Sequence, residues 1–185
     1  MHSNLHTVIA IDTSPTRLAL ARHNAVIYGV EDRIEFVLAD YLSFARTYHT
    51  LPTQQASNTK PNSPHRKIDV VFLSPPWGGP EYLSGLTKDK QPDPSPADQH
   101  PEFSLSNVQP IHGAELFKLS RRITKNIAYF LPRNTKLDEI STLLSPEESK
   151  NEMVEVEEEW MGSKLKALTC YFGGLVAGQE ALFDE

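Results

Sequence analysis

A serine, two prolines and a tryptophan follow one another at Ser74, Pro75, Pro76 and Trp77, directly after the apolar run 68–73. Prolines cannot continue a central strand, so the chain must turn here and present these residues at the strand end. The serine hydroxyl and the first proline carbonyl can both accept hydrogen bonds from an amino group, and the proline rings hold that carbonyl in place. The indole offers a flat face for stacking. These residue types suit a site that holds a planar aromatic amine and orients its nitrogen as a nucleophile.

The alternative is that the prolines merely end a strand and that the tryptophan packs in the core, where this residue type is usually found. Gly78 and Gly79 favour the site interpretation, because two glycines beside the aromatic residue let a bulky ligand approach the backbone. A small polar residue, two prolines and an aromatic residue resemble the motif of methyltransferases that act on exocyclic amines of nucleobases. Ser74, Pro75 and Pro76 are therefore the predicted catalytic residues.

Two acids end neighbouring apolar runs in the first part of the chain. Asp12 closes the run 7–12 and is placed to accept hydrogen bonds from two ribose hydroxyls. Asp40 follows the run 33–38 and can accept from an adenine amino group, with Tyr41 or Leu42 lining the base. Asp12 alone is equally well explained as a turn or helix-capping residue, and it would suit NAD as well as S-adenosylmethionine. For Asp40 alone, a turn or a helix cap is the better explanation. Together they predict a site shaped for adenosine, and Asp12, Asp40 and Tyr41 are the candidate cofactor-binding residues.

The elements that must position these residues alternate along the chain. A helix is predicted after the first strand, because Ser14 suits the N-cap, Pro15 suits the first helical position and Gly29 ends the pattern. Alternating strands and helices imply a parallel sheet, and a terminal hairpin adds an antiparallel edge. The predicted fold class is therefore α/β. The remaining patterns predict strands at 68–73 and 126–131, helices at 113–125 and 137–144, and a hairpin of 152–160 and 164–172 with Val154 and Val156 pointing inward.

The composition bounds the class of protein. With 185 residues, a single domain over 1–185 is expected, carrying disordered proline-rich insertions at 49–66 and 84–110. The one cysteine, Cys170, cannot form an internal disulfide and matches no zinc-ligand spacing, so no metal is expected. The net charge of −6 argues against a protein that grips long nucleic acid through its phosphates. No apolar run is long enough to cross a membrane, and no signal peptide precedes the first strand, so an intracellular protein is expected.

Five segments together resemble the trimethylguanosine synthase family. They are VIAID, LADYL, LSPPWGGPEY, FKLSRRITKNIAYFLPRN and ALTCYFGGL. The resemblance implies a Rossmann-like class I S-adenosylmethionine-dependent methyltransferase sheet with a C-terminal antiparallel hairpin. It also implies methyl transfer from S-adenosylmethionine to the exocyclic N2 of the 7-methylguanosine cap of small nuclear and small nucleolar RNAs. The product would be the 2,2,7-trimethylguanosine cap.

The resemblance also implies substrate-binding roles. Trp77 would stack on 7-methylguanine, whose positive charge adds a cation–π term of about 1 to 2 kcal/mol. Arg133 resembles the family's phosphate-contacting arginine, with Asn134 in the same pocket, and the alternative for Arg133 is a surface salt bridge. Independently of the resemblance, the pairs Arg121–Arg122 and Lys164/Lys166 are candidates for a small basic patch that contacts the first nucleotides of the RNA. The alternative, and the commoner meaning of such pairs, is a solvated helix or strand face.

The chain departs from the family at its beginning. Class I methyltransferases usually open with a strand, a Gly-x-Gly loop and a helix, whereas the first glycine here is Gly29. We therefore expect the first strand and helix to be missing and the chain as given to lack activity. The chain would be a fragment, a wrongly started gene model or a degenerate homologue, and the intact later motifs favour the first two. The completed protein would be a nuclear monomer with proteins of small nuclear and nucleolar ribonucleoproteins as partners and no membrane. Two alternatives are a methyltransferase for another exocyclic amine, such as adenine N6, and a non-catalytic cap-binding module.

Overall fold

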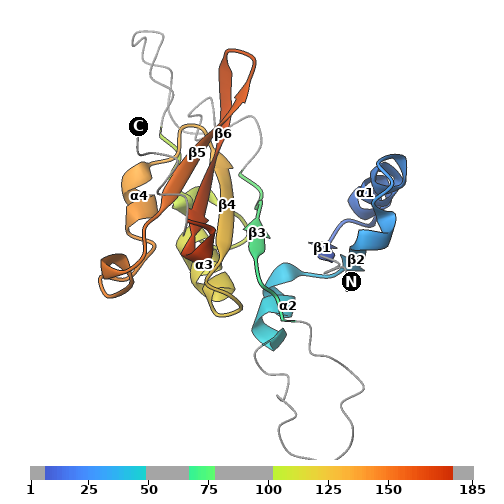
Figure 1. Cartoon of the computed structure of the whole chain (residues 1–185), viewed down its shortest axis with the longest axis horizontal. Coiled ribbons are helices and arrows are strands. Elements are labelled where there is room, and N and C mark those ends of the chain that lie inside the picture. Colours follow the sequence, from blue (N-terminus) through green and yellow to red (C-terminus); the bar gives the residue numbers. More distant parts are fainter. Residues whose placement is uncertain (1–6, 49–66, 78–101, 177–185) are drawn as a thin grey trace, which may run out of the picture. The chain divides into compact units, whose positions relative to one another are not determined.

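A computed structural model describes residues 7–48, 67–77 and 102–176 of the chain. They belong to two compact units, here called unit 1 (Met1–Ser57) and unit 2 (Asn58–Glu185). Each unit has its own sheet, as Figure 1 shows, and helices accompany both sheets. The prediction of an α/β protein is confirmed. The expectation of a single domain concerns how the two units join, and it stays a prediction.

Unit 1 contains a pair of parallel strands and two helices. Strand β1 (Val8–Asp12) pairs with β2 (Ile34–Leu38), helix α1 (Pro15–Ile27) and the 3-10 turn η1 (Glu31–Arg33) connect them, and α2 (Tyr41–Tyr48) follows β2. Because the strands are parallel, their carboxyl ends lie at the same edge of the sheet. The predicted unit of strand, helix and strand is confirmed.

Helix α1 begins and ends where its sequence pattern predicts. The Ser14 hydroxyl accepts a hydrogen bond of 3.3 Å from the Arg17 backbone N–H, and Pro15 is the first helical residue. The helix stops before Gly29, whose φ of +64° lies in the left-handed region that glycine adopts without strain. The serine cap and the glycine stop therefore set the length of the connection between the two strands.

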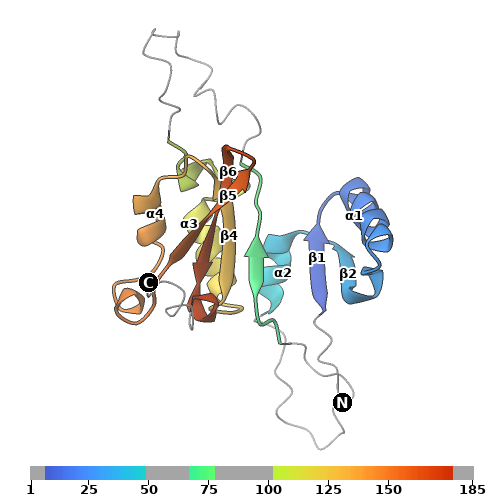
Figure 2. The same cartoon turned by 45° about the horizontal axis from the view of Figure 1, so that its top comes forward.

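Unit 2 contains a four-stranded mixed sheet in the order β3-β4-β6-β5. Its strands are β3 (Val71–Leu73), β4 (Ile127–Pro132), β5 (Glu155–Met161) and β6 (Lys164–Phe172). Strands β3 and β4 are parallel, whereas β6 is antiparallel to both β4 and β5. The last two strands form the predicted hairpin, which turns at Gly162 with a φ of +60° (Figures 1 and 2).

Among the described residues of unit 2, five short helical elements accompany this sheet. They are η3 (Leu105–Asn107), α3 (Gly113–Arg121), α4 (Leu137–Ser141), η4 (Glu148–Lys150) and η5 (Gly173–Leu175). The ring of Phe117 on α3 lies 4.5 Å from that of Phe172 and stacks on Tyr129 at 6.5 Å, measured between centroids. Helix α3 thus covers the sheet face that holds the buried core residues of alternate strand positions: Val71, Leu73, Ile127, Tyr129, Leu131, Leu168, Cys170 and Phe172.

Part of the predicted disordered insertion at 84–110 is ordered, so the prediction is wrong there. Phe103, Leu105 and Val108 are only 2%, 1% and 1% exposed, and they belong to the core of unit 2. The prolines of the segment outweighed these three apolar residues in the composition argument, although few apolar side chains suffice to hold a short segment against a sheet. The rest of this insertion and all of 49–66 lie outside the described residues.

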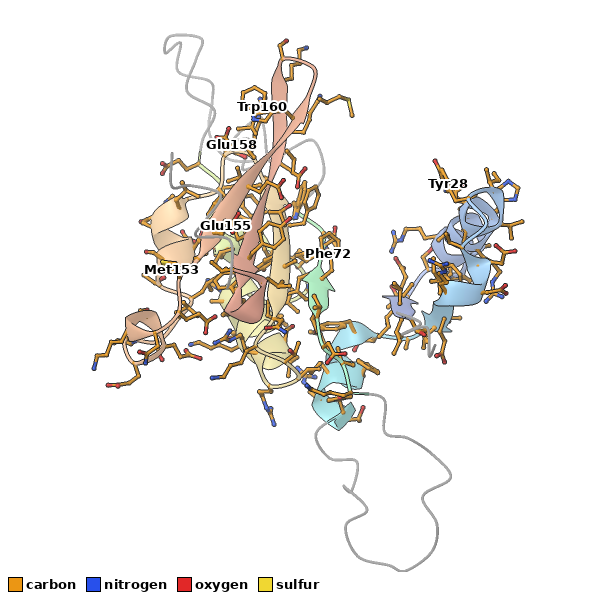
Figure 3. The ribbon with its side chains drawn as sticks, viewed as in Figure 1. Tyr28, Phe72, Met153, Glu155, Glu158 and Trp160 are labelled. Carbon is orange, nitrogen blue, oxygen red and sulfur yellow. The ribbon has the colours of Figure 1, made fainter. Side chains whose placement is uncertain are left out.

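The inward orientation predicted for Val156 is confirmed, because Val156 pairs with the buried Cys170 and so faces the core side of the sheet. Val156 is nevertheless 38% exposed, because β5 is the outermost strand and has a neighbour on one side only. Figure 3 shows Trp160 and Glu158 on the same strand, where the indole N–H donates to the carboxylate at 3.0 Å. Glu159, also on β5, accepts a hydrogen bond of 2.6 Å from the buried Thr169 hydroxyl.

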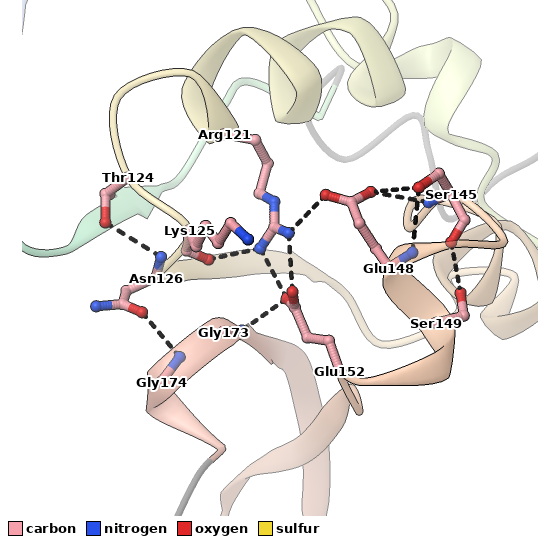
Figure 4. Close-up of polar contacts among 10 residues, drawn as sticks. All are labelled: Arg121, Thr124, Lys125, Asn126, Ser145, Glu148, Ser149, Glu152, Gly173 and Gly174. Atoms are coloured by element: carbon pink, nitrogen blue, oxygen red, sulfur yellow. Dashed lines mark hydrogen bonds and ion pairs between the residues drawn. The ribbon is translucent and has the colours of Figure 1, made fainter.

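Arg121 is a structural residue rather than part of a basic patch for RNA (Figure 4). Its side chain is only 9% exposed, and its guanidinium lies 2.7 Å from Glu152 and 2.9 Å from Glu148. It also donates to the backbone carbonyl of Lys125 at 2.7 Å, while Glu152 accepts a second hydrogen bond, of 2.8 Å, from the Gly173 N–H. One side chain therefore ties the end of α3 to η4 and to the end of β6.

We expect Arg121→Met to lower the free energy of unfolding by about 3 to 5 kcal/mol, because it leaves the largely buried carboxylate of Glu152 without its cation. Urea denaturation followed by circular dichroism measures this change. Arg122 is the next residue and is exposed, so Arg122→Met is the matched control and should change stability by less than about 0.5 kcal/mol. Equal effects of the two substitutions would contradict the structural role.

The same ion pair makes stability depend on pH. The hydrogen bond from Arg121 is the main reason that the pKa of Glu148 lies at about 2, below its ordinary value of 4.5. A carboxyl group with a lowered pKa stabilises the fold above its unfolded pKa, and this contribution is lost as pH falls through the folded value. Stability should therefore decrease between about pH 4.5 and 2, and Arg121→Met should flatten this part of the profile. An equally steep decrease in the variant would disprove the assignment.

Candidate functional site

The predicted catalytic residues begin immediately after β3, at the carboxyl end of that strand. Ser74 and Pro76 are exposed, whereas Pro75 and Trp77 are half-buried. The Pro76 carbonyl accepts a hydrogen bond of 3.2 Å from the backbone N–H of Gln109. The segment is therefore tied to the rest of unit 2, while the hydroxyl predicted to contact an amine lies on the surface.

Trp77 packs beside other aromatic rings on the sheet face that α3 does not cover. Its ring centroid lies 5.0 Å from that of Phe130, with 39° between the ring planes. Phe130 in turn lies 6.2 Å from Phe72, which is 62% exposed and is labelled on β3 in Figure 3. Phe72 and Phe130 alternate with the buried residues of their strands, which places them on the opposite face. We call these three residues the aromatic row.

Sequence analysis did not identify Phe130. It lies inside the apolar run of β4, and a strand buried on both faces shows no alternation that would reveal which side chains point toward a site. The β3–β4 register pairs Leu73 with Tyr129, so its continuation brings Phe130 beside Ser74. Only the strand order could have pointed to Phe130: it is an aromatic residue near the carboxyl end of β4, the strand that lies parallel and next to β3, which carries the motif at its end.

The two other predicted substrate-binding residues follow β4 at the same edge of the sheet. Arg133 is half-buried, and its guanidinium donates to the Leu165 backbone carbonyl at 3.3 Å. The Asn134 carbonyl accepts a hydrogen bond of 2.8 Å from the Phe103 N–H. Because β3 and β4 are parallel, this loop and the segment that starts at Ser74 lie at neighbouring strand ends. The structure thus brings the predicted catalytic and substrate-binding residues to one edge.

In unit 1, Asp12 makes local contacts at the end of β1. Its carboxylate accepts a hydrogen bond of 2.6 Å from the Ser14 N–H and two from the Arg17 guanidinium, at 2.9 and 3.0 Å. The Arg17 hydrogen bond is the main cause of a lowered pKa of Asp12, so the group is ionised at neutral pH. These contacts match the turn-acid alternative, and a ligand role for the same carboxylate stays a prediction.

Asp40 begins helix α2. Its carboxylate accepts hydrogen bonds from the Ser43 hydroxyl at 2.7 Å and from the Ser43 N–H at 2.9 Å, and these contacts lower the pKa of Asp40. The ring of Tyr41 lies 6.4 Å from that of Phe44 on the same helix. The backbone N–H of Ala39 donates to the Asp12 carbonyl at 3.2 Å. The two acids thus stand at adjacent strand ends, as predicted, and Asp40 also caps a helix.

In the part of the chain that the structure describes, no three His, Cys, Asp or Glu side chains lie close enough together to hold a metal ion. Cys170 is fully buried in the sheet of unit 2 and carries a free thiol. Within the same residues, no helix has the length and apolar character needed to span a membrane.

The relatives found by comparison with known proteins include two trimethylguanosine synthases. The chain is 34% identical over 141 residues to the trimethylguanosine synthase of Schizosaccharomyces pombe. The aligned region covers 72% of this chain and 45% of that protein. The chain is also 31% identical over 134 residues to the trimethylguanosine synthase of Saccharomyces cerevisiae. Here the aligned region covers 72% of this chain and 34% of that protein. The chain therefore spans less than half the length of these relatives.

A family model extends the similarity over nearly the whole chain. The model described as RNA cap guanine-N2 methyltransferase matches residues 1–175. The match includes both acids of unit 1, the motif after β3 and the loop after β4. The resemblance seen in the sequence is confirmed, and the chain belongs to the RNA cap guanine-N2 methyltransferase family.

Proposed function

We propose that this chain provides the cap-binding and methyl-transfer residues of a trimethylguanosine synthase. The protein would move a methyl group from S-adenosylmethionine to the exocyclic N2 of a 7-methylguanosine cap. The observation that carries the proposal is the position of Trp77, half-buried against Phe130 and directly after Ser74 and Pro75 at the carboxyl end of β3. This arrangement suits stacking of a base with its amine toward the two oxygen acceptors.

The proposed chemistry needs orientation rather than a strong base. The lone pair of an exocyclic purine amine is delocalised into the ring, so the nitrogen must be held and partly pyramidalised as the methyl group arrives. The Ser74 hydroxyl and the Pro75 carbonyl can accept hydrogen bonds from its two N–H groups and stabilise the positive charge that develops. As the N–C bond forms, the bond between the sulfonium sulfur and the methyl group would break to leave S-adenosylhomocysteine, and the methylated amine would lose one proton to water at this exposed position. Trp77 favours a base that already carries the 7-methyl group, because the cationic ring gains about 1 to 2 kcal/mol over an indole face.

The cofactor would bind at the strand ends of unit 1. Asp12 would accept from the ribose hydroxyls, and Asp40 with Tyr41 would hold the adenine. The residues fit this ligand, because the side chains of Asp12 and Arg17 are 30% and 67% exposed and an ion pair so open to water contributes little to stability, so it can open for a ligand. S-adenosylmethionine supplies the methyl group on its sulfonium.

Substrate and cellular context follow from the same proposal. The guanidinium of Arg133 would leave the Leu165 carbonyl to bind the cap triphosphate, with Asn134 beside it. The substrates would be small nuclear and small nucleolar RNAs in the nucleus, brought by proteins of their ribonucleoproteins.

An adenine-N6 methyltransferase is the second candidate, because the motif suits any exocyclic amine. Competition between 7-methyl-GTP and adenine nucleotides separates the two, and preference for adenine would refute the cap proposal.

We predict that Trp77→Ala weakens 7-methyl-GTP binding about tenfold to a hundredfold, because a stacked base is worth about 1 to 3 kcal/mol. Isothermal titration calorimetry measures the affinity for 7-methyl-GTP and for GTP, and the difference between the two ligands should shrink. Trp160 is 57% exposed on β5 and makes Trp160→Ala the matched control. Unchanged affinity in Trp77→Ala would place the cap site elsewhere.

Phe130→Ala should weaken 7-methyl-GTP binding about twofold to tenfold, because an aromatic pair contributes about 0.5 to 1.5 kcal/mol beyond its buried area. The reason is the 5.0 Å contact, through which Phe130 supports the indole from one side. Phe72→Ala removes the exposed end of the aromatic row and should have a smaller effect, measured by the same calorimetry. If Phe72→Ala weakened binding as much as Phe130→Ala, support of Trp77 would not explain the loss.

Asp12→Ala should weaken S-adenosylhomocysteine binding and leave 7-methyl-GTP affinity nearly unchanged. Two charge-assisted hydrogen bonds to ribose hydroxyls would be lost, each worth about 1.5 to 3 kcal/mol. The matched variant Arg17→Met frees the carboxylate from its ion pair, so its cofactor affinity should equal or exceed that of the wild type. Calorimetry with S-adenosylhomocysteine and with 7-methyl-GTP measures both affinities for each variant. Equal S-adenosylhomocysteine affinity in wild type and Asp12→Ala would leave Asp12 as a turn acid.

A further inference from the structure

The ordered segment 103–109 of unit 2 is anchored in the core at three points. Phe103, Leu105 and Val108 are all 2% exposed or less, and η3 forms between them. We call this segment the strap. Because these three side chains are buried in the core, the backbone of the strap is held in a fixed position against the sheet.

The two ends of the strap contact the two loops of the candidate cap site. At one end, Phe103 donates to the Asn134 carbonyl at 2.8 Å and accepts from the Lys136 N–H at 3.0 Å. At the other end, Gln109 donates to the Pro76 carbonyl at 3.2 Å. The strap thus joins the loop after β3 to the loop after β4 through backbone hydrogen bonds that no side-chain change at those positions would remove.

A single carboxylate holds the middle of the strap. One oxygen of Glu139, in the first turn of α4, accepts hydrogen bonds from the Leu105 N–H at 2.7 Å and from the Ser104 hydroxyl at 3.1 Å. The Ser104 hydroxyl also accepts from the Ser106 N–H at 3.2 Å and so caps η3. The carboxylate is partly buried, and hydrogen bonds to a charged acceptor are among the stronger ones in proteins.

We infer that Glu139 is a positioning residue for cap binding: it fixes the strap, and the strap sets the spacing between the Pro76 and Asn134 loops. The inference rests on the proposed function, because the two loops carry Trp77 and Arg133. A loop that is already held in its binding geometry does not lose conformational entropy when the ligand arrives. Glu139 itself touches neither the motif nor the phosphate-binding candidate, so it acts through the strap.

The test compares Glu139→Ala, Glu139→Gln and Asp138→Ala in the full chain. Glutamine keeps an oxygen that can accept both hydrogen bonds, and Asp138 is the neighbouring exposed acid in the same helical turn. Amide hydrogen exchange followed by NMR reports on the strap without any ligand. Calorimetry with 7-methyl-GDP reports on cap binding.

In Glu139→Ala, the Leu105 and Gln109 amides should exchange at least about tenfold faster, because the lost charge-assisted hydrogen bonds held them closed. The affinity for 7-methyl-GDP should fall about threefold to tenfold, since the loops must then be ordered on binding. Glu139→Gln should restore both properties, and Asp138→Ala should change neither.

Three results would overturn the inference. They are an unchanged Gln109 exchange rate in Glu139→Ala, faster exchange with undiminished affinity, and a uniform acceleration that includes the amides of β4. The last would mean general destabilisation. Failure of the wild type to bind 7-methyl-GDP would refute the proposed function, and the Gln109 exchange rate would then decide by itself whether Glu139 fixes the strap.

Discussion

The parallel register between β3 and β4 is the constraint on which the arrangement of the candidate cap site depends. It brings the carboxyl ends of two strands, separated by more than fifty residues in sequence, to one edge of the sheet. The register is held at the opposite end. There, the Thr124 hydroxyl and the Asn126 side-chain amide both donate to the Asp69 carbonyl at 2.9 Å, and Val71 donates to the Asn126 carbonyl at 3.0 Å. A slip by one residue would turn Phe130 to the other face and remove the support of Trp77.

Local signals allowed much of the fold to be predicted. The Ser14 cap, the proline after it and the glycine stop define α1 without any tertiary contact, which is why this helix was predicted correctly at both ends. The hairpin was predicted from alternation and its glycine turn. The motif after β3 was recognised because its residue types are unusual for a strand end, and the family match supports that resemblance.

The errors arise where the deciding contact is distant in sequence. Arg121 seemed to belong to a basic patch, because Glu148 and Glu152 follow it by about thirty residues and only the fold brings them together. The burial of Leu105 depends on α3: a Cβ atom on Gly113 would lie 3.1 Å from that leucine and 2.7 Å from the Tyr129 hydroxyl. Proline content carries no information about such packing. The two acids of unit 1 show the converse case, since their short-range capping contacts are visible in the sequence and are compatible with a ligand role.

The hydrogen bond between the Pro76 carbonyl and the Gln109 N–H has a consequence for how such chains can vary in length. Pro76 and Gln109 lie far apart in sequence, yet their backbone atoms are 3.2 Å apart, so the fold fixes the distance between these two points of the chain. Closing a loop costs free energy that grows only with the logarithm of its length, by about 0.6 kcal/mol for each doubling. A change in the number of residues between Trp77 and Phe103 should therefore alter the free energy of closing this connection only slightly, and it leaves the hydrogen-bonding groups of Pro76 and Gln109 unchanged.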